Sequence, residues 1–176
     1  LEPSLDDWVQ WAYQNNLDTD VISFIQYRPN LLSNFNADEY AFPTPRAWSM
    51  VSKKMSRANS DPERLFFGVS SLVGDGPAGE FVAFKEIASK LPDIDQLIKD
   101  PSTYKKDDNP ALLYALSTAV AARAEDDLME NIMKLNKKIP VEFQVVLVKG
   151  CLAKNRELKS HNDVRKWIVD NANVVL

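Results

Sequence analysis

The sequence predicts an all-α fold, a multi-helix bundle of roughly nine or ten helices. Apolar residues recur three and four positions apart along most of the 176 residues, which is the period of an amphipathic helix. No segment shows a convincing alternation of apolar and polar residues, which a half-buried strand requires. Residues typical of helix starts and ends also separate the apolar stripes.

The first two predicted helices lie near the N-terminus. Ser4 is the expected cap of the first, because Asp6 and Asp7 follow it in the first turn and complement the helix dipole. Its apolar stripe is Leu5, Trp8, Val9 and Ala12. The second helix is expected to start at a cap on Thr19 or Asp20 and to stop before Pro29, because the residue before a proline resists helical geometry. Its apolar residues are Val21, Ile22, Phe24 and Ile25.

A loop is predicted over residues 30–43, followed by three helices. The turn formers of the loop are Asn30, Ser33, Asn34, Asn36 and Pro43. The third helix starts at Pro45, with Trp48, Val51 and Met55 on one face and Lys53, Lys54 and Arg57 on the other. The fourth starts at Asp61-Pro62-Glu63 and ends at Gly74. The fifth begins near Pro77 and buries Phe81, Phe84 and Ile87 or Ala88.

The second half of the chain repeats this helical pattern after a polar connector. Residues 93–98 form at most two helical turns, and residues 101–109 are the best internal boundary. A helix led by Pro110 and a stripe of Leu128, Ile132 and Leu135 follow. The run Val141–Val148 is ambiguous, since its β-branched residues favour a strand and its helical neighbours favour a buried helix, which we prefer. Ser160 to Asp163 has the spacing of a capping box ahead of the last helix.

Composition narrows the classes of function. A formal net charge of −4 gives no general attraction to nucleic acid or anionic membranes, so neither is an expected partner. One cysteine, Cys151, and one histidine, His161, cannot assemble a disulfide or a zinc site, and a thiol–imidazole pair is improbable. With no signal pattern or membrane-length apolar run, we expect a cytoplasmic protein. The start at Leu1, almost directly before the helical pattern, predicts a piece of a longer protein.

The chain offers no complete catalytic apparatus. The segment Gly74–Gly79 resembles a phosphate-binding loop, but Glu80 and Phe81 stand where that motif needs lysine and Ser/Thr, and no strand precedes it. A helix end followed by a helix start is the better interpretation. The adjacent acidic pairs point to different helix faces and lie near predicted caps, so none is typical of an acid–base pair. They are Asp6/Asp7, Asp107/Asp108 and Asp126/Asp127.

The segment Phe42–Trp48 is the best candidate for a binding site. Thr44 is the expected N-cap and Pro45 fits the first helical position, which places Arg46 in the second position. The helix dipole disfavours a cation there, whereas an anion from another domain would meet both the guanidinium and the first-turn amides. The alternative is that Arg46 is solvated or pairs with Asp38 or Glu39. On residue chemistry alone this alternative is preferred, because surface pairs are common and weak.

Thr44-Pro45-Arg46 resembles the short Ser/Thr-Pro-Arg signature in the helical lid of MoxR-type AAA+ ATPases, in bacterial or phage members. The two helices before it are similar to the preceding lid helices. The stretches 68–84 and 141–144 resemble the helical extension of that family. The resemblance implies that Arg46 is a sensor 2 residue, with Thr44 and Pro45 in the same ATP-binding segment, and it reverses the preference stated above.

The resemblance also implies what this chain lacks. Walker A, Walker B and the arginine finger have no counterpart here, so ATP and Mg²⁺ would be held by an upstream domain and this chain alone would not hydrolyse ATP. Residues 1–60 would be the lid and residues 61–176 the extension, with the connector near 100–109 inside it. Partners would be the upstream domain, other subunits of a homo-oligomeric ring, and an unknown protein substrate. In the ring, Arg46 would couple nucleotide state to lid position.

Two other functions are weighed against this one. In a free-standing helical module for protein–protein interaction, Arg46 would be structural or would contact a protein carboxylate, and the module would expose an apolar or aromatic patch. The tryptophans Trp8, Trp11, Trp48 and Trp167 are expected in the core, although Trp8 and Trp11 lie on different faces and one could be partly exposed. A small-molecule enzyme is disfavoured because no set of residues supports it.

Overall fold

The chain is all-helical in the parts that the structure describes. We use a computed structural model that describes residues 3–36, 39–55 and 61–175, and every regular element in these ranges is a helix. The chain divides into two compact units, Leu1–Lys90 and Leu91–Leu176, which we describe separately. The predicted fold class is therefore confirmed. None of the described helices is both long enough and apolar enough to cross a membrane.

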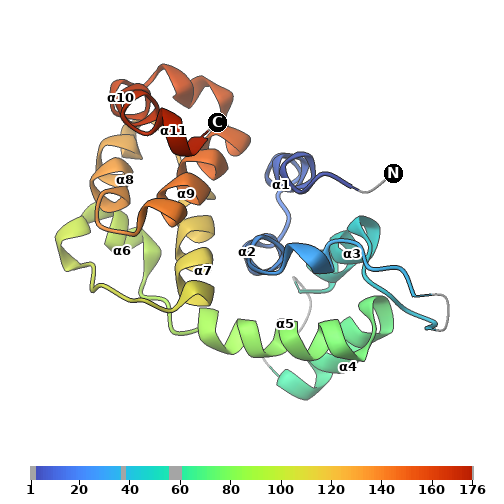
Figure 1. The fold of residues 1–176 in the computed structure, drawn as a ribbon. Helices are drawn as coiled ribbons and strands as arrows, with labels where there is room; N and C mark the ends of the chain where they lie inside the picture. The colour runs from blue at the N-terminus through green and yellow to red at the C-terminus, as the bar shows by residue number, and fades with distance from the viewer. Residues whose placement is uncertain (1–2, 37–38, 56–60, 176) are drawn as a thin grey trace. The chain divides into compact units, whose positions relative to one another are not determined.

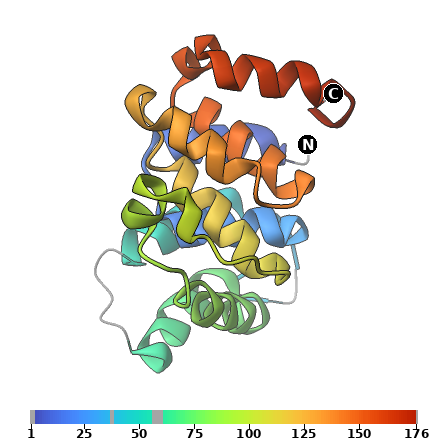
Figure 2. The ribbon, with the colours of Figure 1, turned by 90° about the vertical axis from the view of Figure 1, so that its left-hand side faces the viewer.

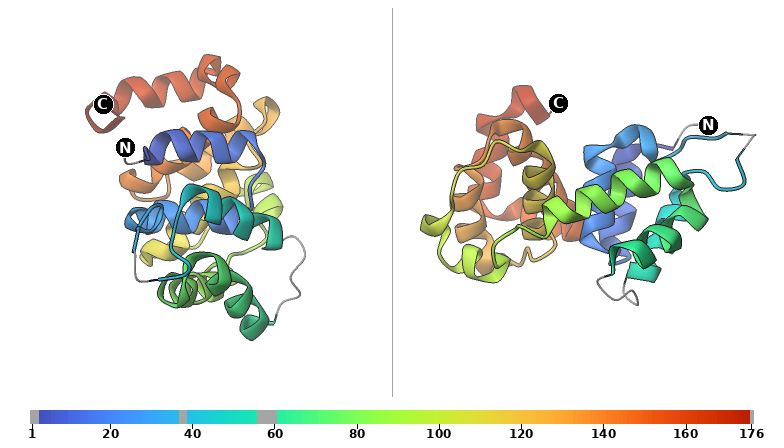
Figure 3. Two further views of the ribbon diagram at one scale, coloured as in Figure 1. Left: turned by 90° about the vertical axis from the view of Figure 1, so that its right-hand side faces the viewer. Right: turned by 90° about the horizontal axis from the view of Figure 1, so that it is seen from below.

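The first unit packs its helices around aromatic side chains. It contains α1 (Leu5–Gln14), α2 (Thr19–Tyr27), the 3₁₀ turn η1 (Pro29–Leu31), α3 (Pro45–Met55), α4 (Pro62–Val73) and α5 (Asp75–Ala88). Within this unit, α2 and α3 lie between α1 on one side and the hairpin of α4 and α5 on the other (Figures 1 and 3). The ring of Phe24 lies 5.4 Å from that of Trp48 and 5.3 Å from that of Phe81. Helix α5 therefore belongs to the core that supports α3.

The second unit has a mainly aliphatic core. Its elements are α6 (Ile94–Lys99), η2 (Pro101–Thr103), α7 (Pro110–Ala121), η3 (Asp126–Leu128), α8 (Met129–Asn136), α9 (Val141–Lys154), η4 (Arg156–Ser160), α10 (Asn162–Asp170) and α11 (Ala172–Val175). Helix α7 packs along α9, and α10 packs on α8 at one end of the unit (Figure 2). Leu113, Ile132 and Leu147 are buried among them.

The ambiguous run Val141–Val148 is helical, as we preferred. It forms the first part of α9, which starts directly after Pro140 and continues to Lys154. Its inward positions, including Leu147 and Val148, are buried. Helical neighbours therefore outweigh β-branched composition here, because a lone strand would have no partner for its backbone groups.

Helix starts are predicted correctly where a cap precedes a proline, and less well elsewhere. Thr44 caps α3 and Asp61 caps α4, both as expected. The cap of α2 is Asp18 instead of Thr19 or Asp20, because the Asp18 carboxylate accepts the backbone N–H of Asp20 at 2.9 Å. This correction lengthens α2 at its start, by one residue relative to a cap at Thr19 and by two relative to a cap at Asp20.

Three further boundaries differ from the prediction. Helix α5 begins at Asp75, two residues before Pro77, because Gly74 ends α4 and starts α5 without a connector. The segment around Ser160 is a 3₁₀ turn, and His161 caps α10 in place of Ser160, with its Nδ1 accepting from the Asp163 N–H at 3.3 Å. Pro29–Leu31 forms one 3₁₀ turn, which takes in the first two residues of the predicted loop 30–43.

The compact units do not by themselves assign a lid or an extension. The unit that contains α3 also contains α4 and α5, which the resemblance places in the extension, and it ends before the connector at 101–109. The reason is that Phe81 and Phe84 of α5 complete the aromatic core around Phe24. The division at residue 60 stays a prediction, and residues 56–60, with Arg57, lie outside the described ranges.

Candidate functional site

The start of α3 has the predicted local geometry. The Thr44 hydroxyl accepts the backbone N–H of Ala47 at 3.0 Å, and the Thr44 carbonyl accepts that of Trp48 at 3.0 Å. Pro45 is the first helical residue, where its missing N–H leaves no hydrogen bond unmade. These contacts fix the backbone on both sides of Arg46.

Arg46 lies exposed in the first turn of α3 and makes no ion pair with any described carboxylate. Its carbonyl accepts the hydroxyl of Ser49 at 2.7 Å, which is an internal contact of the helix. Of the two carboxylates that could have paired with it, Glu39 does not, and Asp38 lies outside the described residues. Arg46 is thus exposed at the positive end of the helix dipole, where an incoming anion could meet its guanidinium.

Buried residues on both sides of Arg46 anchor this segment to the core. Trp48, two positions after Arg46, is fully buried, and its Nε1–H donates to the Leu31 carbonyl at 2.6 Å. Pro43 is buried as well, and its carbonyl accepts the N–H of Asn34 at 3.1 Å. Arg46 is therefore an exposed cation on a backbone that is anchored before and after it.

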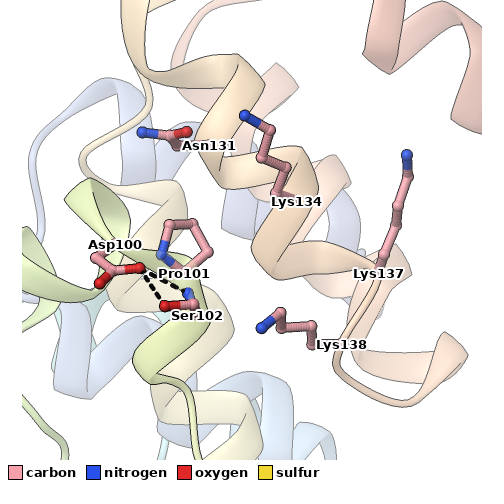
Figure 4. A pocket seen from close by; sticks show the side chains of 7 residues that line it. All are labelled: Asp100, Pro101, Ser102, Asn131, Lys134, Lys137 and Lys138. Carbon is pink, nitrogen blue, oxygen red and sulfur yellow. Dashed lines mark hydrogen bonds between the residues drawn. The ribbon is translucent and has the colours of Figure 1, made fainter.

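The structure contains a second candidate in the other unit, which the sequence did not indicate. A hollow of about 530 Å³ lies between η2 and α8 (Figure 4). It is lined by Asp100, Pro101, Ser102, Asn131, Lys134, Lys137 and Lys138. The three lysines could have been noted as a cluster at a helix end, but the contact of η2 with α8 is not local in sequence.

Most of the charged side chains that line this hollow already interact with neighbouring residues or with the dipole of α8. Hydrogen bonds from Ser102 and the charge of Lys138 lower the pKa of the Asp100 carboxyl. Lys134 pairs with Glu130 at 2.7 Å, one turn earlier on the same helix. Lys137 and Lys138 follow the C-terminus of α8, where cations complement the helix dipole. We therefore do not assign a ligand to the hollow.

The nucleophile and metal chemistry of the described chain is limited. Cys151 is fully buried, and burial raises the pKa of its thiol to about 12, so the reactive thiolate is suppressed. The His161 ring nitrogen is occupied as the cap of α10. Within the described ranges, no group of three or more His, Cys, Asp or Glu side chains could hold a metal ion.

An acidic cluster at the start of α2 is part of the fold. Asp20 pairs with Lys85 of α5 at 2.7 Å, and the N–H of Asp18 donates to the Ser52 hydroxyl at 2.7 Å. Burial and the neighbouring Asp20 raise the pKa of Asp18. The cluster joins α2 to α3 and α5, and its groups are engaged with one another.

Several large apolar side chains of the first unit are exposed. Of the tryptophans, Trp8 is buried and Trp11 is 43% exposed, as their different helix faces suggested. Phe35 of the loop before α3 is 73% exposed and packs edge-on against Phe42, with ring centroids 5.0 Å apart. Phe67 of α4 is 62% exposed. These side chains are scattered over three elements.

No protein-family model, curated protein or solved structure matches this chain significantly.

Proposed function

We propose that this chain is the helical lid and extension of a MoxR-type AAA+ ATPase, and that Arg46 contacts the γ-phosphate of ATP held by an upstream nucleotide-binding domain. The observation that carries the proposal is an exposed arginine without a carboxylate partner among the described residues, in a helical turn that otherwise favours anions. The Thr44-Pro45-Arg46 signature supports the same role. In an intact ring, a contact between Arg46 and the phosphate would link hydrolysis to lid movement and to the next subunit.

This chain would contribute only part of the nucleotide site. The upstream domain would supply the P-loop, the Mg²⁺ ligands and the groups that orient the attacking water. Arg46 would supply a positive charge that matches two phosphate oxygens in a bidentate geometry. The single, fully buried and unreactive Cys151 fits the reducing cytoplasm, where we place the protein.

The decisive test is Arg46→Ala in the intact protein that carries both domains. We expect ATP turnover to fall about 10²- to 10³-fold, the usual effect of removing one donor to the transition-state charge. Arg64→Ala is the matched control, because Arg64 is also an exposed arginine in the first turn of a helix that begins with a cap and a proline. Wild-type turnover in Arg46→Ala, or an upstream reading frame without a P-loop, would contradict the proposal.

The 176-residue chain gives a second test. We expect very weak ATP binding at best, because one arginine and a helix start lack the P-loop that holds most of the phosphate. Calorimetric titration with ATP measures this directly. Micromolar affinity would contradict the division of the site between two domains.

The alternative function is a free-standing module for protein–protein interaction, in which exposed aromatic residues such as Phe35, packed against Phe42, would contact the partner. In that case Phe35→Ser and Phe67→Ser would abolish binding to the partner, whereas Arg46→Ala would leave the ATP turnover of the intact protein unchanged. The two proposals therefore predict opposite results for Arg46.

A further inference from the structure

Gly74, the residue between α4 and α5, has a backbone conformation that glycine alone adopts readily. Its φ is +85° and its ψ is 165°, and it is the only glycine of the described chain with a positive φ. A side chain is strongly disfavoured in this region of φ and ψ. The N–H of Gly74 still donates to Ser70 of α4, and its carbonyl still accepts from Ala78 of α5. One residue thus ends one helix and starts the next.

The absence of a side chain also allows another segment to approach closely. A Cβ on Gly74 would lie 2.8 Å from the carbonyl oxygen of Ala41 and 3.3 Å from Oε2 of Glu39. The Ala41 oxygen belongs to the backbone, so it cannot rotate away as a flexible side chain could. The junction of α4 and α5 therefore supports the loop that leads into α3.

The path from Ala41 to Arg46 is short and stiff. Pro43 and Pro45 fix two of its φ angles, and each proline also restricts the residue before it. The Pro43 carbonyl is bonded to the Asn34 N–H, and Thr44 caps the helix. A displacement of Ala41 would consequently be passed on to the first turn of α3 instead of being absorbed by the loop.

The same hairpin also holds the far end of α3. Lys54 Nζ donates to the Gly68 carbonyl at 3.1 Å and to the Ser71 hydroxyl at 3.3 Å, both on α4. Helix α5 is tied to α2 by the ion pair between Lys85 and Asp20. The hairpin of α4 and α5 therefore contacts α3 near its C-terminus and, through Gly74, just before its N-terminus.

We propose that Gly74 is a positioning residue for Arg46: the bare backbone at the α4–α5 junction sets the distance at which the loop packs, and with it the place of the guanidinium. This inference rests on the proposed function, because it concerns how Arg46 meets its phosphate. It also gives a role to the glycine-rich segment that does not fit a P-loop. Gly74 contacts no nucleotide itself and acts through residues 39–45.

The test compares Gly74→Ala with Gly76→Ala in the intact protein. Gly76 is two residues away, has no positive φ, and a Cβ there meets no atom within 4 Å, so it is a matched control. We expect Gly74→Ala to lower ATP turnover by about 10- to 100-fold, as a misplacement near 1 Å can do. Gly76→Ala should stay near the wild-type rate. Similar rates in the two variants would overturn the inference.

A double-mutant cycle distinguishes an effect of Gly74 on the position of Arg46 from an effect of Gly74→Ala that does not involve Arg46. If Gly74 acts through Arg46, Gly74→Ala should reduce turnover in the wild-type background and have little further effect in Arg46→Ala. An equal reduction in both backgrounds would mean that Gly74 acts independently of Arg46, and would overturn the inference. No reduction by Arg46→Ala in the first place would count against the proposed function instead.

Hydrogen exchange provides a readout that does not depend on activity. Amides of residues 39–48 should exchange faster in Gly74→Ala than in Gly76→Ala, because the loop has to move away from the junction. Unchanged exchange in this segment would contradict the support that Gly74 gives, whatever Arg46 does. If Gly74→Ala fails to fold, Pro43→Ala replaces it and loosens the same path with Gly74 intact. Wild-type turnover and exchange in that variant would equally overturn the inference.

Discussion

The two units differ in what fills their cores. Of the 17 aromatic side chains, 13 lie in Leu1–Lys90 and four in Leu91–Leu176. The first unit is also acidic, with eight basic and 12 acidic side chains, whereas the second has 13 of each. Aromatic rings pack in preferred orientations, and aliphatic side chains are less directional. The first unit therefore has the more specific core, and its candidate site is built directly on that core.

Trp48 makes this link explicit. It belongs to the aromatic cluster and also to α3, two positions after Arg46. The side chain that packs in the core therefore also fixes the helix that carries Arg46. The hollow of the second unit has no comparable link, because the three lysines that line it are exposed and none of them belongs to the buried core. A core mutation should consequently disturb the candidate site in the first unit and leave the second unit unaffected.

The largest expected effect is that of Trp48→Ala. Removal of a fully buried tryptophan should reduce the free energy of unfolding of the first unit by about 3–5 kcal/mol. Hydrogen exchange, resolved by peptide, measures the two units separately. Trp48→Phe should cost less, since it keeps a ring and loses the hydrogen bond to Leu31. Equal loss of protection in α7 and α9 would refute the independence of the two cores.

The next largest effect is expected in the second unit, where a substitution should increase the free energy of unfolding. Asn136 is fully buried at the end of α8, and its amide finds no hydrogen-bond partner among the described residues. Asn136→Leu, which replaces the amide by an apolar group of similar size, should raise the free energy of unfolding by about 1–3 kcal/mol. Exchange of α8 and α10 amides checks this, with exposed Lys137→Leu as the control. A destabilised Asn136→Leu would mean that the amide is satisfied in solution.

The sequence predicted the helices and their starts better than it predicted which helices contact one another. Cap-and-proline starts were located correctly at Thr44 and Asp61, because these interactions lie within four residues. The cap at His161 was missed, since histidine is not a usual cap and Ser160 offered a better match to the rule.

For the candidate site, too, the sequence predicted local interactions but not contacts between distant residues. The segment Thr44–Arg46 was identified from local chemistry, and its capping geometry is confirmed. Its support by Gly74 was not, because that contact depends on how residues more than 30 positions apart meet. Only the packing of the hairpin on the loop shows why a glycine stands there.

The ionisation of Asp18 should make the stability of the first unit depend on pH. Burial first, and then Asp20, raise the pKa of Asp18, so its ionisation disfavours the folded state. Its contribution to stability is thus greatest at low pH and is lost as the pH rises from the ordinary Asp pKa of about 3.9 to the raised folded value. Asp18→Asn keeps the capping oxygen and should stabilise the first unit at pH 7.

The measurement for Asp18 is a series of urea unfolding curves at several pH values. The gain from Asp18→Asn should shrink as the pH falls below that window, because the wild-type carboxyl is then protonated in both states. Asp93→Asn, at the exposed cap of α6, serves as the control in the second unit. A gain that grows on acidification would contradict the direction of the shift in Asp18.

The smallest effect on stability is expected at the candidate site itself. Arg46→Ala should change the free energy of unfolding by no more than about 0.5 kcal/mol, and the change should be a slight gain, because a cation in the first helical turn opposes the dipole. Thermal unfolding of Arg46→Ala beside Arg64→Ala measures it. A loss above about 1 kcal/mol would reveal a structural partner for Arg46 and favour the ion-pair interpretation. A negligible change together with a large loss of ATP turnover would separate Arg46 from Trp48, two positions away, and assign the arginine to ligand binding and the tryptophan to the core.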